Sequence, residues 1–284
     1  MIPLAISNIA WSPDRHEDVL PLLRDAGVCG LEIAPGLAFV GEADPFAPSQ
    51  SAVDAFVSAL DAHGLRLVSM QSLLFGVDDA HLFGPPAARN RFMTGIRRAI
   101  DLANRLGIAN LVLGAPTNRA IPEGMDHADA EAMAVDMFRD LGRHCAGGVA
   151  RLALEPNPHA YGTNFMNTAD QTAAIVRRVD HPNVTLNFDL GALAMNDEGY
   201  IAGDVFDRMA ALTSHVHISE PHLARVPADL ANLEQTVRRI VATGYRGWFS
   251  IEMRRSADNE IATIRTSVTH TRAALMAAVE RPST

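Results

Sequence analysis

The chain has 284 residues, of which 48% are hydrophobic and 20% charged, a composition typical of an ordinary globular protein with an ample core. A formal net charge of −9 argues against nucleic acid as a partner, because proteins that bind phosphate backbones carry basic surfaces. All 24 basic residues are arginine, and the lack of lysine excludes Schiff-base chemistry and the lysine of a phosphate-binding loop.

The N-terminus lacks the basic region and apolar segment of a secretion signal, and the apolar runs are too short for a membrane helix. Cys29 and Cys145 are the only cysteines and lack the spacing of a metal-binding pair. We therefore expect them to be buried or half-buried thiols. A cytoplasmic protein with no membrane partner is the expectation.

Short apolar runs alternate with longer amphipathic segments along the whole chain. Turn residues that suit helix C-termini separate them, among them Gly27, Gly64, Gly107 and Gly244. Strands are expected over residues 3–7, 30–33, 65–70 and 109–113, over a run that ends in Glu155, and over residues 184–189, 214–218 and 248–252. Helices are expected over residues 13–26, 51–63, 87–106, 128–146, 168–179, 203–212, 227–243 and 259–279.

Eight alternating strand–helix pairs predict a single-domain (β/α)8 TIM barrel spanning residues 1–284. A doubly wound sheet is the second candidate fold. It would be expected to carry a Gly-rich phosphate turn after an early strand, and none is present.

Four metal-seeking side chains each follow an apolar run near the end of an expected strand: Glu155, Asp189, His217 and Glu252. The gaps between them are 34, 28 and 35 residues, and a strand with its crossover helix takes roughly 30 residues or more. Each gap therefore corresponds to one strand–helix unit. The four side chains are expected to meet at one rim of the barrel.

The alternation of side chains along these strands agrees with that placement, because successive residues of a barrel strand face the interior and the helix layer in turn. If the four residues face inward, so must Ala153, Asn187, His215 and Ser250, which are small or polar. The opposite positions are apolar and suit packing beneath helices; they are Leu152, Leu154, Leu186, Phe188, Val216, Phe249 and Ile251.

Carboxylate oxygens with one imidazole nitrogen predict one divalent cation: Mn²⁺, Mg²⁺, Co²⁺ or Zn²⁺. Such an ion can chelate a hydroxy-carbonyl compound and stabilise the negative charge that develops as an adjacent C–H proton leaves. Carboxylates on opposite sides could then donate and accept the proton.

These residues resemble the sugar isomerase/epimerase-like TIM barrels related to xylose isomerase and D-tagatose 3-epimerase. The resemblance covers nearly the whole chain and is most specific at residues 154–158, 187–191 and 215–222. It implies that Glu155, Asp189, His217 and Glu252 hold the ion, and that Glu155 and Glu252 move the proton through an enediolate. It also implies a small sugar or sugar-derived substrate and a possible homo-oligomer.

Two positions depart from the epimerase pattern. A substrate-binding histidine expected three residues after Asp189 is replaced by Ala192, and an arginine expected six residues after His217 is replaced by Leu223. These departures argue against a plain ketohexose 3-epimerase. They keep open a lyase or dehydratase of a keto-sugar or cyclic keto acid, which would use the same ligands.

Several further residues are candidates for substrate contact, each with a structural alternative. Trp11 could stack on a sugar face, or be a rim residue. Glu32 could bind a sugar hydroxyl or the catalytic residues, or form a structural ion pair. His215 reads as a second-layer histidine rather than a ligand. The remaining candidates lie on loops directly after ligands and are Asn157, His159, Asn164, Glu220, His222 and Arg254, the last beside Arg255.

Two other functions use the same fold. A nuclease acting on abasic DNA would need further histidines and a basic groove. A non-catalytic sugar-binding barrel is also conceivable, because fold alone does not establish turnover. Carboxylates at both acid–base positions argue against it.

Overall fold

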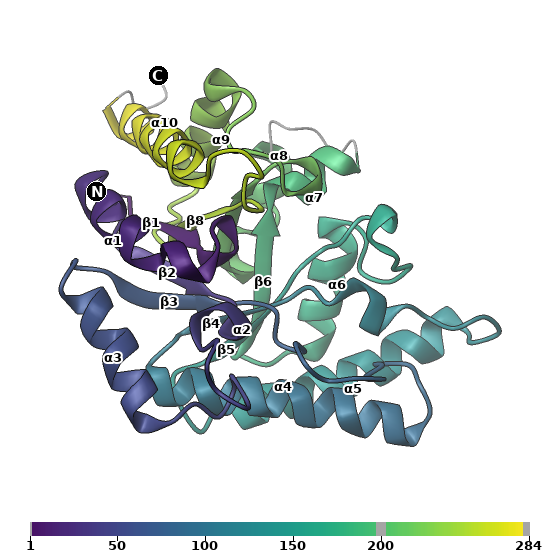
Figure 1. Ribbon diagram of the computed structural model, residues 1–284. Helices are drawn as coiled ribbons and strands as arrows, with labels where there is room; N and C mark the ends of the chain where they lie inside the picture. The colour runs from purple at the N-terminus through teal and green to yellow at the C-terminus, as the bar shows by residue number, and fades with distance from the viewer. Residues whose placement is uncertain (1, 197–202, 281–284) are drawn as a thin grey trace.

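The computed structural model describes residues 2–196 and 203–280. Its parallel strands form a closed barrel in chain order (Figure 1). They are β1 (Leu4–Ser7), β2 (Gly30–Ile33), β3 (Arg66–Met70), β4 (Asn110–Leu113), β5 (Arg151–Leu154), β6 (Val184–Asp189), β7 (Thr213–Ser219) and β8 (Trp248–Glu252). Pairing of β1 with β8 closes the ring, with Ala5 opposite Ser250. The predicted (β/α)8 barrel is confirmed.

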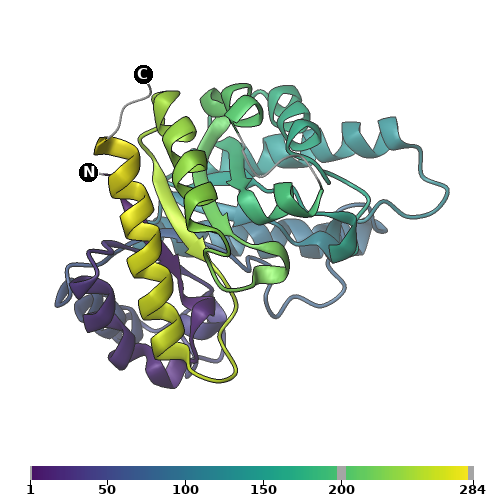
Figure 2. The same cartoon turned by 90° about the horizontal axis from the view of Figure 1, so that it is seen from above.

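Helices surround this barrel and connect successive strands (Figures 1 and 2). The longer ones are α1 (His16–Asp25), α3 (Gln50–Asp61), α4 (Pro86–Leu106), α5 (His127–Cys145), α6 (Ala169–Val179), α9 (Leu230–Ala242) and α10 (Glu260–Glu280). α10 contacts both α9 and α1, so the last helix of the chain lies beside the first. No helix in the described ranges is both long and apolar enough to cross a membrane.

The helix ends follow local sequence signals. The Asp126 side chain accepts hydrogen bonds from the first amides of α5, and Thr168 forms a capping box with Gln171 at α6. Gly107 ends α4 with a φ of 70°, in the left-handed region that glycine adopts without steric cost. These signals explain why the predicted boundaries of the long helices lie close to the observed ones.

The prediction was less accurate for short helices near the rim. The expected helix over 203–212 is α8 (Gly203–Asp207) followed by a 3-10 turn (Ala210–Leu212). The expected helix over 13–26 begins as a 3-10 turn (Pro13–Arg15) before α1. Two helices were not predicted, α2 (Pro35–Ala38) and α7 (Leu190–Met195). Both are too short to show a helical period in the sequence.

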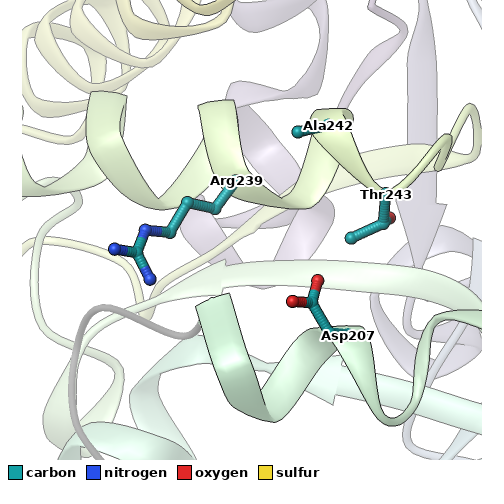
Figure 3. Close-up of a pocket in the computed structure, with 4 residues that line it drawn as sticks. All are labelled: Asp207, Arg239, Ala242 and Thr243. Carbon is teal, nitrogen blue, oxygen red and sulfur yellow. The ribbon is translucent and has the colours of Figure 1, made fainter. Parts of the chain in front are cut away.

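The hydrophobic core lies between the strands and the helix layer. All seven apolar residues expected on the outer side of the last strands have no exposed surface. On the outside of this layer, α8 and α9 frame a surface pocket of about 340 Å³ lined by Asp207, Arg239, Ala242 and Thr243 (Figure 3). The Arg239 side chain points away from Asp207 there. The two charged groups of the pocket therefore do not meet.

Candidate metal centre and acid–base site

The four predicted ligands come together at the carboxyl ends of the last four strands. Glu155 directly follows β5, Asp189 and Glu252 end β6 and β8, and His217 lies near the end of β7. Pairing sets Asp189 opposite His217, and Ser219 opposite Glu252. All four are buried, and one ligand atom from each lies within 4.8 Å of the others.

The separations between these atoms fit a single cation. His217 Nδ1 lies 3.1 Å from Glu155 Oε1, 3.2 Å from Glu252 Oε2 and 3.5 Å from Asp189 Oδ2. Neighbouring donors about 2.1 Å from a hard cation in an octahedral shell are roughly 3 Å apart. Nδ1 is also buried, and no hydrogen bond of good geometry reaches it from the described residues. A buried imidazole nitrogen that faces three carboxylates can bind a cation once its proton is displaced.

Buried amides fix the orientation of the Glu155 carboxylate. Asn187 donates to Oε1 at 2.7 Å, and Asn157 donates to Oε2 at 3.1 Å. Arg119 donates from Nη2 to Asn157 Oδ1 and to the Glu155 carbonyl oxygen. Gly114 lies against the same carboxylate, since a Cβ on it would be 2.7 Å from Glu155 Oε2. Glu155 is thus held on both oxygens while one still faces His217.

Asp189 is oriented by the helix that follows it. Its Oδ1 accepts from the backbone N–H of Ala192 at the start of α7, and its Oδ2 accepts from Ser219 Oγ at 2.8 Å. The unpredicted helix α7 therefore has a clear role, because its first amides position a candidate ligand.

His217 is oriented from behind by a carboxylate that does not reach the cluster. Its Nε2 donates to Glu32 Oε2 at 3.0 Å, which leaves Nδ1 directed at the other three residues. Glu32 Oε1 accepts from Gln71 Nε2, which also donates to Ser7 Oγ. A carboxylate behind a ligating imidazole fixes its tautomer and raises its basicity. Glu32 is thus fully buried against His217 and His215, and its part in substrate binding or catalysis stays a prediction.

The charges in this cluster shift several pKa values. Burial disfavours the charged form of Glu32, but the pKa of this carboxyl group lies well below its ordinary value because His217 is adjacent. Burial likewise opposes the charge on His217, yet Glu32 and Glu252 raise its pKa well above the ordinary value. Burial, with repulsion from Glu155 and Asp189, raises the pKa of Glu252 to about 7 despite attraction from His217. Four acidic groups around one imidazole form a strongly cation-attracting site.

His215 lies one layer deeper, as expected for a second-layer residue. Its ring is fully buried, and its Nε2 lies 3.3 Å from Glu32 Oε2 without the geometry of a hydrogen bond. The rings of His215 and His217 meet edge to face.

The predicted loop residues occupy different environments around the rim. Asn164 is tied to the backbone of Ile121 through both ends of its amide. Glu220 is buried and accepts from the Ala228 amide. His159 and Arg254 are exposed, and their contact with a substrate stays a prediction.

Two aromatic contacts complete the rim. His222 is exposed, has a left-handed φ of 58° and packs edge-on against Tyr161. Tyr161 is close enough to the cluster for Asp189 to add to the effect of burial in raising its pKa. Trp11 is 2% exposed and stacks with His16, so its contact with a sugar stays a prediction.

The sequence reasoning missed several residues that orient the site. Ser219 shares the inward alternation of His215 and His217, so the strand pattern could have identified it. Arg119 lies in a 3-10 turn (Pro116–Arg119) after β4 and has no such signal, although it is only 1% exposed. Burial lowers its pKa to about 9.

The fold and the residue cluster together define a class of protein. The chain matches the model of the xylose isomerase-like TIM barrel family over residues 20–274. It belongs to that family. This confirms the resemblance drawn from its sequence.

Several named relatives lie within this class. A Streptomyces coelicolor protein named "Putative hydroxypyruvate isomerase" is 29% identical over 222 residues, 74% of this chain and 77% of that protein. A mouse protein of the same name is 25% identical over 91% of this chain and 92% of its own length.

Among solved structures, a 3-keto-D-glucoside 4-epimerase from E. coli superposes with a TM-score of 0.78 at 17% identity, covering 96% of this chain and all of that one. An L-ribulose 3-epimerase superposes at 0.76 with 18% identity, covering 99% and 96%. At such identities these structures support the fold.

Proposed function

We propose that the chain is a divalent-metal-dependent isomerase or epimerase that moves a proton next to a carbonyl group through an enediolate. The observation that carries this proposal is His217 Nδ1, buried without a hydrogen bond and surrounded by oxygens of Glu155, Asp189 and Glu252 at 3.1–3.5 Å. Mn²⁺, Mg²⁺, Co²⁺ and Zn²⁺ all suit these donors. The bound ion would supply electrostatic stabilisation of negative charge on the substrate carbonyl oxygen.

Two carboxylates are available for the proton transfer. Glu155 is held in one orientation by Asn157 and Asn187, so its free electron pair has a fixed direction. Glu252 is the second carboxylate, with its Oε2 3.2 Å from His217 Nδ1, and a carboxylate can accept or donate a proton during the reaction. One glutamate removes the proton from the hydroxyl-bearing carbon. For epimerisation, the other returns a proton to the opposite face of the same carbon. For isomerisation, it returns a proton to the former carbonyl carbon, while the hydroxyl proton passes to the former carbonyl oxygen.

We infer a small hydroxy-carbonyl substrate, with a hydroxy-keto acid as the first compound to test. The names of the related proteins point in this direction, and Ala192 and Leu223 replace two residues of the ketohexose epimerase pattern. The carboxylate of such a substrate needs a cationic partner. Arg254, exposed two residues after Glu252, is the candidate.

Product analysis in deuterated water tests this function. Protein loaded with Mn²⁺ is incubated with hydroxypyruvate, and separately with ketohexoses, and the products are followed by NMR. We expect an isomeric product that carries deuterium at the carbon next to the carbonyl. An unsaturated product would instead assign the lyase reaction, which the same ligands permit.

Glutamine variants test the roles of the two glutamates. Glu155→Gln and Glu252→Gln each remove one oxygen donor and one proton carrier, so we expect losses of at least about a hundredfold in kcat/KM. Glu123→Gln is the matched control, since Glu123 is exposed and lies outside the cluster. Full activity in either site variant would contradict the proposal.

A further inference from the structure

A second cavity lies at the opposite end of the barrel from the candidate metal centre. It has a volume of about 400 Å³, and its lining includes Arg66, Arg151 and Trp248, the first residues of β3, β5 and β8. Asn110, the first residue of β4, and Ser214 near the start of β7 complete its polar wall. Because all strands are parallel, these N-terminal ends form the floor of the barrel.

The charge of this cavity is opposite to that of the chain. Two guanidinium groups line it, and none of its lining residues is acidic, although the chain carries a net charge of −9. Within residues 2–196 and 203–280, neither Arg66 nor Arg151 forms an ion pair. The Arg66 guanidinium instead lies over the Trp248 ring, 5.3 Å from its centroid. Both cations are therefore available to an anion.

Hydrogen bonds build the floor of the cavity into a fixed polar surface. Ser214 Oγ donates to Asn110 Oδ1 at 2.7 Å, which joins β7 to β4 across the barrel. Thr185 lies within 2.7 Å of the same hydroxyl, and Asn110 Nδ2 donates to Ser69 Oγ. This wall is held by the strands rather than by mobile loops.

The inner wall contains a polar side chain without a hydrogen bond. His215 lines the cavity and is completely buried. Its Nε2 lies 3.3 Å from Glu32 Oε2, outside hydrogen-bond geometry, and within the described part of the chain its Nδ1 has no hydrogen-bond partner. A buried nitrogen of this kind costs free energy unless a further group satisfies it. A polar ligand reaching the inner end of the cavity would do so.

We propose that this floor cavity is a binding site for a compact dianion, a phosphate group or a small dicarboxylate. The forked donors of arginine match the oxygens of both groups, and about 400 Å³ lies in the range of small-molecule sites. The dianion lies between Arg66 and Arg151. The part of the ligand that reaches the inner end of the cavity meets Ser214 and His215. The lining of this site includes none of the four proposed metal ligands.

The two tryptophans make a direct binding test possible. Trp11 and Trp248 are the only ones in the chain, so Trp11→Phe leaves Trp248, in the wall of the cavity, as the only indole fluorophore. Inorganic phosphate and malonate are titrated into this variant at constant ionic strength, with chloride as the compensating anion. Trp248 emission and the melting temperature are both recorded.

We expect saturable changes with at least one of the two anions. Arg66→Ala and Arg151→Ala should each weaken binding by about tenfold, the usual effect of losing a charge-assisted hydrogen bond. Arg265→Ala, which removes an exposed charge from α10, should leave binding unchanged. Response to phosphate alone would assign a phosphate ester, and response to malonate alone a dicarboxylate.

Two results would overturn the proposal. One is the absence of a saturable change in both readouts with both anions. The other is an equal response in the Arg66→Ala/Arg151→Ala double variant, because any binding would then occur elsewhere. Neither result bears on the metal-dependent reaction, whose test measures products formed at the other end of the barrel.

Discussion

Replacing Glu32 by glutamine tests whether the carboxylate that accepts a hydrogen bond from His217 Nε2 strengthens cation binding at Nδ1. Glu32 is fully buried and accepts a hydrogen bond from His217 Nε2 at 3.0 Å and one from Gln71 at 2.9 Å. Glutamine keeps the size of the side chain and one acceptor oxygen, but it removes the negative charge. It also sets an NH2 group against one of the two donors, so the variant removes the charge of Glu32 together with one of its hydrogen bonds.

The magnitude follows from two opposing effects. Loss of a carboxylate behind a ligating imidazole typically weakens metal affinity 10- to 100-fold, about 1.4–2.8 kcal/mol. Glu32 is also the strongest of the groups that raise the pKa of His217. In the variant this pKa should fall, so fewer molecules carry the proton that a cation has to displace from Nδ1. We expect a net loss of affinity of about tenfold or more, with fewer protons released for each ion bound.

Calorimetric titration with Mn²⁺ in two buffers of different ionisation enthalpy measures both quantities at once. Glu123→Gln serves as the control, and circular dichroism checks that the variant is folded. Unchanged affinity together with unchanged proton release would refute the reasoning. In that case the hydrogen bond from His217 to Glu32 would be structural only.

Four further predictions rest on shifted pKa values and on one close contact at Gly114. Affinity for Mn²⁺ should fall as the pH drops below about 7, because Glu252, whose pKa is raised to about 7, must lose its proton to bind; a flat pH profile in calorimetry would contradict this. In the metal-free chain the same raised pKa means that stability is lost as the pH rises toward 7, and denaturant titrations should show this loss diminished in Glu252→Gln. Gly114→Ala would place a Cβ 2.7 Å from Glu155 Oε2, so we expect kcat to fall at least tenfold with little change in melting temperature; unchanged kcat would show that Glu155 can move aside. Burial raises the pKa of the Cys145 thiol to about 12, so a thiol reagent at pH 8 should modify Cys29 alone until the chain is unfolded. The same raised pKa predicts that the free energy of unfolding declines above pH 9, and that it declines less in Cys145→Ala.

The sequence could predict the barrel because its signals are local and repeated. Each strand is a short apolar run, each long helix has its own caps, and the residues 30–33, 184–189 and 248–252 were predicted with their observed bounds. Parallel strands in chain order also place their carboxyl ends at one rim. That rule alone brings Glu155, Asp189, His217 and Glu252 into one neighbourhood.

The residues that orient this cluster were not readable in the same way. Arg119 reaches Glu155 from a turn 36 positions earlier, and Glu32 reaches His217 across 185 positions. No periodicity in the sequence links such pairs, because the contacts depend on barrel closure and on which rotamers the packing allows. The short helix α7 belongs to this group as well, since Asp189 and Ser219 fix its start only after β6 and β7 have paired.

The floor cavity was also decided by the tertiary structure. In the sequence, Arg66, Arg151 and Trp248 are unremarkable residues at the starts of three separate strands. Parallel pairing around a closed barrel gathers these starts at one end just as it gathers the carboxylates at the other. The sequence by itself determined which side chains stand at the two ends of each strand. Only closure of the barrel decided which of them meet, because that distance is set by packing between segments far apart in the chain.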